Sequence, residues 1–558
     1  MKFPWFRTGT VTTPSSRDAS VDSSSSYQTF AGYDKDTYII GPYLPEKNTR
    51  REGESFIWYH LRLMASRKSL AQIHQEAEES AMRRSLNALD LALVGIGCII
   101  GGGIFVLTGV AAAEHAGPAI IVSFLIAGVC AGFAAFAYAE LASMVHIAGS
   151  AYTYTYATMG EFLGWIIGWD LILEYLVGAS TIAVSWSSYL VALFKDAFGV
   201  TLDSNTTQSP LKWTDNSFQV TGSAVNIPAI LIVVIVTLVV LVGIKQTAIV
   251  NAVACSIKIL VVLIFVFGAC SKVDPANYQP FIPPRIDGKY GGLGIIRGAK
   301  QVFFSYIGFD AVASAAQEAK NPKRDLPIGI FSALVICTAL YIATATVVVG
   351  LRPYYELDVP HPISFALETF SGTRWLRILV DIGAVAGLLS VLVVNILSQS
   401  RIFHSMAHDG MFPKIMGRIH PRFRTPYVPI LIVGSISAVL SGFLPVDVLA
   451  DMTSVGTLLA YFLANVGVII LRFTHPDTPR GFRIPFGPFV FPVLGALISM
   501  ALIVLSEVSS IYRLLVWLGI GFIVYFAYGH RKSKVNFPIV QDTGSFSSIS
   551  DKDSVVEK

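Results

Sequence analysis

Long apolar runs separated by short polar segments follow one another along most of this 558-residue chain. Each run is near the length of about 20 residues that a helix needs to cross a bilayer. Because backbone polar groups in lipid must be satisfied within the segment, such runs predict membrane-spanning helices. About twelve spans are expected, near residues 88–112, 118–145, 160–194, 226–244, 248–270, 294–316, 327–350, 375–404, 426–444, 447–472, 488–506 and 511–529.

The composition indicates a polytopic membrane protein. Hydrophobic residues make up 53% of the chain and charged residues 14%, and the mean hydropathy is +0.60, which is too apolar for a water-soluble domain. The net charge of +4 is spread over many loops, so no nucleic-acid partner is expected. No cofactor or metal is expected either, because the five cysteines lie in or beside apolar segments without metal-ligand spacing: Cys98, Cys130, Cys255, Cys270 and Cys337.

Polar tails flank the apolar region. Residues 1–85 are Ser-rich and then charged and weakly helical, which predicts a cytosolic, partly disordered tail. An even number of spans returns residues 531–558 to the cytosol as a second tail, and the Lys- and Arg-rich loops support this orientation. Asn205 begins an Asn-Thr-Thr glycosylation sequon in a predicted outer loop. We expect a multi-pass protein in contact with membrane lipid, in the plasma membrane or alternatively the vacuolar membrane.

Glycine interrupts the first span. Residues 94–109 read Val-Gly-Ile-Gly-Cys-Ile-Ile-Gly-Gly-Gly-Ile-Phe-Val-Leu-Thr-Gly, and three consecutive glycines favour local unwinding. Unwound backbone at membrane depth is tolerated only where it is buried in protein or lines a cavity. The N–H groups that begin the second half-helix would suit a carboxylate. The alternative is close helix packing through small residues, because Gly97 and Gly101 have GxxxG spacing.

The sixth span contains a second interruption, where Gly308 and Asp310 stand deep in an apolar run. Interrupted segments in corresponding positions of two halves indicate an inverted-repeat transporter with its site at the midplane. We therefore expect one five-helix repeat over 86–270, a second over 294–472 and two final helices over 473–530. Residues 271–325 would hold the outer loop, the sixth helix and an inner loop.

Ionisable residues inside spans are costly and are functional candidates. Lys258 lies near the middle of the fifth span, and an ammonium deprived of water gives up its proton more readily. It would therefore exchange a proton, or be a fixed cation on the carbonyls of a broken helix. Asp170 and Glu174 share one face of the third span. Asp310 would hold a cationic substrate, cap a half-helix or pair with a cation such as Lys258.

Other polar residues have simpler interpretations. Glu140 falls near the inner end of the second span, where an interfacial anchor or an inner-gate ion pair is expected. Asn395 is a lone amide on an apolar helix, which is typical of a hydrogen bond between helices. His404 and His408 with Asp409 resemble a metal-binding group, but at the inner end of the eighth span solvated loop histidines are expected.

With these residues in place, the chain resembles the cationic amino acid transporter family of the amino acid–polyamine–organocation superfamily, over about residues 83–530. Several motifs in order carry the resemblance: residues 94–109, Gly117-Pro118, Tyr138-Ala139-Glu140-Leu141, Ala148-Gly149-Ser150-Ala151-Tyr152, Gly168-Trp169-Asp170-Leu171-Ile172-Leu173-Glu174-Tyr175, Phe304-Ser305-Tyr306-Ile307-Gly308-Phe309-Asp310, Glu318-Ala319-Lys320-Asn321-Pro322, Ser400-Arg401-Ile402-Phe403 and Asp409-Gly410.

The resemblance implies an all-α, LeuT-like fold with a 5+5 inverted repeat, and alternating-access transport of amino acids, above all arginine, lysine and ornithine. In this family Lys258 would occupy the place of a sodium ion and couple a proton, and Phe309 would be a gate. The substrate carboxylate would meet N–H groups around Ile100, Gly101, Gly102 and Gly103. Its ammonium would meet carbonyls of Ile99, Phe304, Ser305 and Ile307. Its side chain would meet Glu174, Asp310 and Asn395.

Three departures from the family pattern bear on these expectations. The glycine run has Gly102 where many relatives place a small hydroxyl or Ala. Twelve spans match bacterial members better than the fourteen expected of animal members. Residues 195–225 contain no cysteine, so no disulfide-linked heavy chain is expected.

Three alternatives stay open beside proton-coupled cationic transport. One is a potential-driven uniporter or exchanger of broader or neutral specificity, and another is an amino acid sensor of the same fold. A channel is the third. An enzyme is not expected, because no nucleophile–base pair is evident.

Overall fold

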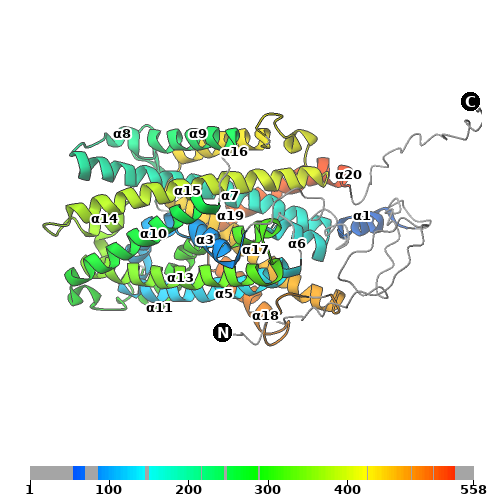
Figure 1. Ribbon diagram of the computed structural model, residues 1–558, viewed down its shortest axis with the longest axis horizontal. Coiled ribbons are helices and arrows are strands. Elements are labelled where there is room, and N and C mark those ends of the chain that lie inside the picture. Colours follow the sequence, from blue (N-terminus) through cyan, green and yellow to red (C-terminus); the bar gives the residue numbers. More distant parts are fainter. Residues whose placement is uncertain are drawn as a thin grey trace, which may run out of the picture.

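The computed structural model describes residues 54–68, 86–144, 150–214, 217–243, 248–286, 289–423, 425–478, 480–506 and 508–534. Most of the predicted N-terminal tail and nearly all of the C-terminal tail lie outside the described residues. Within the described part, α1 (Phe56–Met64) forms in the stretch interpreted as weakly helical. It lies at one end of the helix bundle (Figure 1).

Most of the long helices run roughly parallel to the long axis of the molecule (Figure 1). Seven helical stretches of the described residues are long and apolar enough to cross a membrane, and four shorter apolar helices accompany them. The predicted all-α polytopic fold class is therefore confirmed. Every predicted span overlaps at least one helix, and the longest helix in each span, in chain order, is α3 (Ala88–Ile99), α5 (Ile120–Met144), α7 (Glu161–Leu193), α9 (Ile227–Val242), α10 (Ala248–Ala269), α11 (Gly291–Val302), α13 (Pro322–Leu351), α15 (Arg374–His408), α16 (Tyr427–Phe443), α17 (Val446–Thr474), α18 (Phe491–Val504) and α19 (Val508–Val524).

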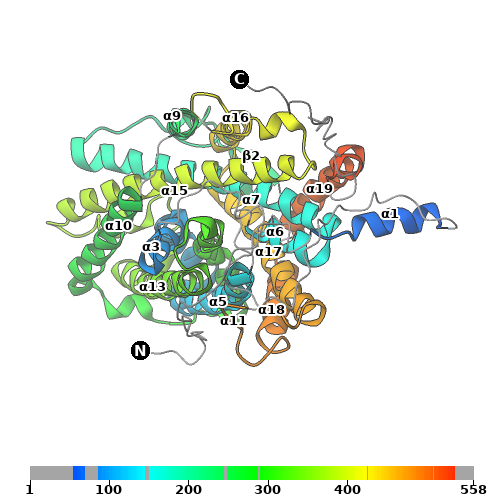
Figure 2. The same ribbon diagram turned by 45° about the vertical axis from the view of Figure 1, so that its right-hand side comes forward.

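Burial separates central helices from peripheral ones. In α7 and α17, 72% of the residues in the most apolar segment are buried inside the protein. In the helical stretch that contains α19, the corresponding share is 22%. Helices α9 and α16 pack together at one edge of the bundle in both views, and α18 and α19 lie away from them (Figure 2). In lipid, a helix that exposes apolar side chains all along one side needs no further cover. The central helices are therefore where a binding site would be enclosed.

Several short elements in the loops escaped the sequence-based prediction. They include an antiparallel hairpin of β1 (Leu211–Thr214) and β2 (Ser217–Val220) in the predicted outer loop. Strands of four residues give too short an alternation to recognise, and the ring contact of Trp213 with Phe218 at 4.8 Å stabilises the pair. The short helices in this group are α6 (Ser150–Met159), α8 (Ser204–Thr207), α14 (Pro362–Ala366) and α20 (His530–Lys532), whereas α4 (Thr108–Ala111) and α12 (Asp310–Ser314) lie inside the predicted first and sixth spans.

Both predicted helix interruptions are confirmed. Helix α3 ends at Ile99, Ile100 is extended with φ −72° and ψ 95°, and a π-helical turn, η1 (Gly103–Leu107), resumes the span. In the sixth span, α11 passes into the 3-10 turn η7 (Phe303–Tyr306), and Ile307 is extended with φ −66° and ψ 134°. Gly308 then adopts φ +123°, a conformation that side-chain-bearing residues rarely accept.

Candidate functional site

The two helix breaks cross in direct backbone contact. A Cβ on Gly103 would lie 2.6 Å from the Ser305 Cβ, and one on Gly308 would lie 2.9 Å from the carbonyl carbon of Cys98. Neither position has room for a side chain. Close packing, the alternative interpretation of the glycine run, therefore applies at Gly103, where it joins two unwound segments, but not at Gly101 of the GxxxG pair, where a Cβ would lie an ordinary 3.6 Å from Val391.

A cavity lies beside this crossing, between the two breaks and the helices α7, α15 and α17. Its walls contain three kinds of group: backbone of the breaks, apolar side chains, and a few polar side chains. The residues that line it are Cys98, Ile99, Gly101, Gly102, Gly103, Glu174, Tyr175, Gly178, Ile182, Phe304, Ile307, Gly308, Ala311, Val391, Val394, Asn395 and Thr453. Apolar walls with a few convergent polar groups are typical of a small-molecule site.

Backbone of the first break, including Gly102 and Gly103, borders the cavity. The first hydrogen bond of the resumed helix runs from the Phe105 N–H to the Gly101 carbonyl, at 3.5 Å. The N–H groups of the first turn have no partner within a helix, and here Gly102 and Gly103 supply two of them. Because both glycines line the cavity, a carboxylate can approach these N–H groups without meeting a side chain.

The Tyr341 hydroxyl joins the two breaks. It lies 2.7 Å from the Ile99 carbonyl oxygen and 2.7 Å from that of Ser305. A hydroxyl has one hydrogen, so it donates to one carbonyl at a time and both oxygens keep capacity to accept another donor. Tyr341 is completely buried, so this contact is shielded from water.

Lys258 lies behind the first break and does not line the cavity. Its side chain is 1% exposed, and its Nζ donates to the carbonyls of Gly97 at 2.7 Å and Ile100 at 3.3 Å. Gly387 of α15 leaves room for the lysine stem, since a Cβ there would lie 3.2 Å from the Lys258 Cγ. The ammonium therefore holds the last turn of α3 and the first unwound residue together.

Asp310 does not pair with Lys258 and does not line the cavity. Its Oδ2 accepts a hydrogen bond of 2.6 Å from the Tyr175 hydroxyl. Asp310 also stands in the first turn of α12, where the helix dipole favours an acid. Of the three alternatives drawn from the sequence, the structure shows no pairing with Lys258 among the described residues and places Asp310 at the first residue of the half-helix α12.

Glu174 is a buried carboxyl in the cavity wall. It is 2% exposed, and neither carboxyl oxygen has a hydrogen-bond partner within the part of the chain that is described. The nearby Thr457 hydroxyl donates to the Thr453 carbonyl instead, at 3.0 Å. A buried carboxylate without a donor is costly, so this group requires either a proton or a ligand that donates to it.

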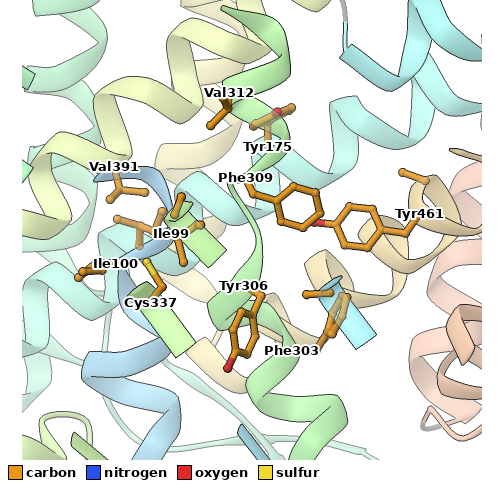
Figure 3. Packing of buried hydrophobic residues seen from close by; sticks show 14 of the residues in the cluster. Ile99, Ile100, Tyr175, Phe303, Tyr306, Phe309, Val312, Cys337, Val391 and Tyr461 are labelled. Carbon is orange, nitrogen blue, oxygen red and sulfur yellow. The ribbon is translucent and has the colours of Figure 1, made fainter. Parts of the chain in front are cut away.

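The expected site residues divide into two groups. Those that line the cavity are Ile99, Gly101, Gly102, Gly103, Glu174, Phe304, Ile307 and Asn395. Ile100, Ser305, Asp310, Lys258 and Phe309 do not. The Phe309 ring is buried between Tyr138 and Tyr461, at 5.6 and 5.0 Å between centroids, and Figure 3 shows it directed toward Tyr461.

Some lining residues were not expected from the sequence. Gly178 and Ile182 stand one and two turns beyond Glu174 on α7, so helical spacing from Glu174 would have found them. Val391 and Val394 are one turn or less before Asn395 on α15 and could have been found in the same way. Thr453 belongs to α17, and no local signal connects it to the site.

Charged residues at one end of the bundle form buried ion pairs. Glu140 accepts from the Arg472 guanidinium at 2.6 and 2.7 Å and lies 3.2 Å from Arg480, which agrees with the expected ion pair. Lys68 donates to Asp409 at 2.8 Å. Burial disfavours the charged Asp409 carboxylate, but Lys68, His408 and Tyr152 together hold its pKa below the usual range. The Asp409 carboxylate is thus engaged in an ion pair rather than offered to a metal.

Comparison with known proteins agrees with this architecture. The family model described as amino acid permease matches residues 86–526. A branched-chain amino acid permease, BcaP, of Bacillus subtilis is 43% identical over 459 residues, which cover 82% of this chain and 96% of the relative. A methylthioribose transporter of the same organism is 38% identical over 470 residues, covering 84% and 98%. The vacuolar cationic amino acid transporter 2 of Arabidopsis thaliana is 37% identical over 430 residues, covering 77% and 66%.

Proposed function

The chain belongs to the amino acid permease family of the amino acid–polyamine–organocation superfamily, and from this premise we propose that it moves cationic L-amino acids by alternating access. Arginine, lysine and ornithine are the proposed substrates, and a proton is the proposed coupling ion. The LeuT-like, all-α fold is that of the family. The 5+5 repeat over 86–270 and 294–472 is part of the proposal.

The observation that carries the cationic assignment is the position of Glu174. Its carboxyl has no donor among the described residues and faces the same cavity as the backbone of both breaks. The N–H groups of Gly102 and Gly103 would bind the substrate carboxylate. The carbonyl of Ile307 and the second lone pair of the Ile99 carbonyl would accept from its ammonium. Glu174 would then pair with the positive end of the side chain.

Coupling would operate through Lys258. The protonated ammonium stabilises the first break by bonding to Gly97 and Ile100, whereas a neutral amine would hold the same carbonyls less strongly. Loss of the proton would therefore loosen the backbone that binds the substrate, without direct contact between proton and substrate. In addition, each positive charge gains about 2.3 kcal/mol per 100 mV of inside-negative potential.

Neutral branched-chain amino acids are the second candidate substrates. The cavity walls include the aliphatic side chains of Ile99, Ile182, Val391 and Val394, and a relative at 43% identity is named a branched-chain amino acid permease. For such substrates Glu174 would have to carry a proton when the cavity closes.

We further propose that both termini are cytosolic and that the plasma membrane is the site of action, with no disulfide-linked heavy chain. The end of the bundle that holds the Glu140–Arg472 and Lys68–Asp409 pairs is rich in Lys and Arg, which supports its cytosolic orientation. Asn205, in α8 of the predicted outer loop, is exposed, which supports its proposed glycosylation.

Replacing Glu174 by Gln tests the assignment. Uptake of arginine and leucine is measured in proteoliposomes with the pH gradient and the membrane potential set independently. Because hydrogen bonds to charged groups contribute about 1.5–3 kcal/mol, arginine uptake should fall by roughly 10- to 100-fold and leucine uptake by much less.

The matched control is Asp170→Asn, which alters a buried acid one turn away on α7 that does not line the cavity. It should affect both substrates equally. If Glu174→Gln lowered the uptake of arginine and of leucine by the same factor, Glu174 would have a structural role rather than a role in substrate binding. A wild-type preference for leucine would overturn the cationic assignment in favour of the second candidate.

A further inference from the structure

Helix α7 contributes Glu174, Tyr175, Gly178 and Ile182 to the cavity wall, and three of these four lie in one row along the helix. Glu174, Gly178 and Ile182 are spaced four apart and all line the cavity, so successive positions are about 6 Å apart along the helix. The face changes from a carboxyl, through a position without a side chain, to an aliphatic group. Because glycine in a helix costs about 1 kcal/mol relative to alanine, the glycine in the middle needs a reason.

Other glycines of α7 are explained by packing, but Gly178 is not. A Cβ on Gly168 would lie 2.6 Å from the Met406 Cε, and one on Gly164 would lie 3.0 Å from the Tyr156 Cβ, so a side chain at either position would have to displace a neighbour. A Cβ on Gly178 would lie 3.5 Å from the Asn395 Nδ2 and 3.6 Å from the Thr453 Cγ2. Those are ordinary van der Waals distances, so alanine would fit and would occupy part of the cavity.

The space beside Gly178 has a defined chemistry. The Thr453 hydroxyl donates back to the Leu449 carbonyl at 3.0 Å, so its methyl group forms the wall that faces Gly178. The Asn395 amide makes no hydrogen bond to another group in the described ranges, and it offers both a donor and an acceptor. Glu174 stands one turn away, and its two carboxyl oxygens have no hydrogen-bond partner among the residues that the structure describes.

We infer that Gly178, together with Thr453 and Asn395, determines the length of the substrate side chain that this transporter accepts. The side chain passes α7 where Gly178 leaves room and ends at the Asn395 amide and the Glu174 carboxyl. The substrate class that fits is an amino acid with an extended side chain ending in hydrogen-bond donors. This inference rests on the proposed function and adds to it a residue that limits size.

The test compares Gly178→Ala and Gly178→Val with the wild-type protein in proteoliposomes, with arginine, lysine and alanine as substrates. One methyl group in a filled pocket changes discrimination by about tenfold or more. Gly178→Ala should therefore raise the KM for arginine and lysine about tenfold and that for alanine less than threefold, and Gly178→Val should enlarge the difference. The control is Gly132→Ala on α5, where a Cβ would lie 3.7 Å from the Leu334 Cδ2, outside the cavity wall.

Thr453→Ser provides an independent variant, because it removes the methyl group that limits the same space and should lower the ratio of the arginine KM to the alanine KM. Equal changes of KM for alanine and arginine in Gly178→Ala, or an unchanged ratio in Thr453→Ser, would overturn the inference. If Gly178→Ala does not fold, the ratio of the arginine KM to the alanine KM in Thr453→Ser is the measurement that tests the inference.

Failure of the proposed function gives a different result. The wild-type protein would then transport leucine rather than arginine. In Gly178→Ala, the uptake of leucine would still fall more than the uptake of alanine.

Discussion

The two helix breaks cross at one point and share the Tyr341 hydroxyl, but among the described residues a cation binds the first break alone. The first break is held by a cation: Lys258 bonds to the carbonyls of Gly97 and Ile100 from the side away from the cavity. The second break has no cation among its described contacts. Its groups are the Tyr341 hydroxyl on the Ser305 carbonyl and the Tyr175 hydroxyl on Asp310.

Because of this difference, response to protons and fixed structural support can belong to different breaks. A lysine can lose its proton and with it much of its hold on a carbonyl, whereas a tyrosine hydroxyl donates in the same way across the working pH range. We therefore expect the first break to respond to protons and the second to act as its fixed support. Three substitutions test this contrast.

The largest effect is expected from Gly103→Ala, because it forces the two breaks apart. The new Cβ would lie 2.6 Å from the Ser305 Cβ and closer still to the Ser305 backbone. Overpacking of this kind should lower the free energy of unfolding by about 3 kcal/mol or more, seen as a lower unfolding temperature in detergent and loss of all uptake. Gly101→Ala is the control, since its Cβ would lie 3.6 Å from Val391. Equal unfolding temperatures of Gly103→Ala and Gly101→Ala would contradict the direct backbone contact between the two breaks.

Lys258→Ala comes next and tests the proton-responsive break alone. It leaves two buried carbonyls without their donor, at a cost of about 1–3 kcal/mol each, and removes the group proposed to exchange the proton. Accumulation driven by a pH gradient should disappear while exchange of substrate across the membrane persists. Lys195→Ala, which removes a half-exposed ion pair with Glu368, should change neither. An unchanged pH dependence of uptake in Lys258→Ala would exclude the coupling role.

The smallest effect is expected from Tyr341→Phe, which weakens the fixed support without removing a charge. The carbonyls of Ile99 and Ser305 would lose their shared donor, and the loss of one buried hydrogen bond is worth about 1 kcal/mol. Uptake should fall by roughly fivefold at every pH, with the same pH profile as the wild-type protein. A shifted pH profile would show that both breaks respond to protons.

The local pattern of the chain was enough to predict the framework of the site. Span length follows from bilayer thickness, and the breaks follow from the glycine run at 101–103 and from Gly308, because backbone satisfaction is decided within each segment. The depth of Lys258 in its span was also enough to predict that its ammonium needs protein partners. All of these are properties of one helix at a time.

Partners on other helices were decided only by the tertiary structure. Asp310 bonds to Tyr175 rather than to Lys258, and Thr453 meets the space beside Gly178, although no spacing along the chain connects these residues. Gly168 and Gly178 occupy one helix and look alike in the sequence. One is packed against Met406 and the other opens the cavity, because contacts between helices depend on which faces meet when α7, α15 and α17 converge.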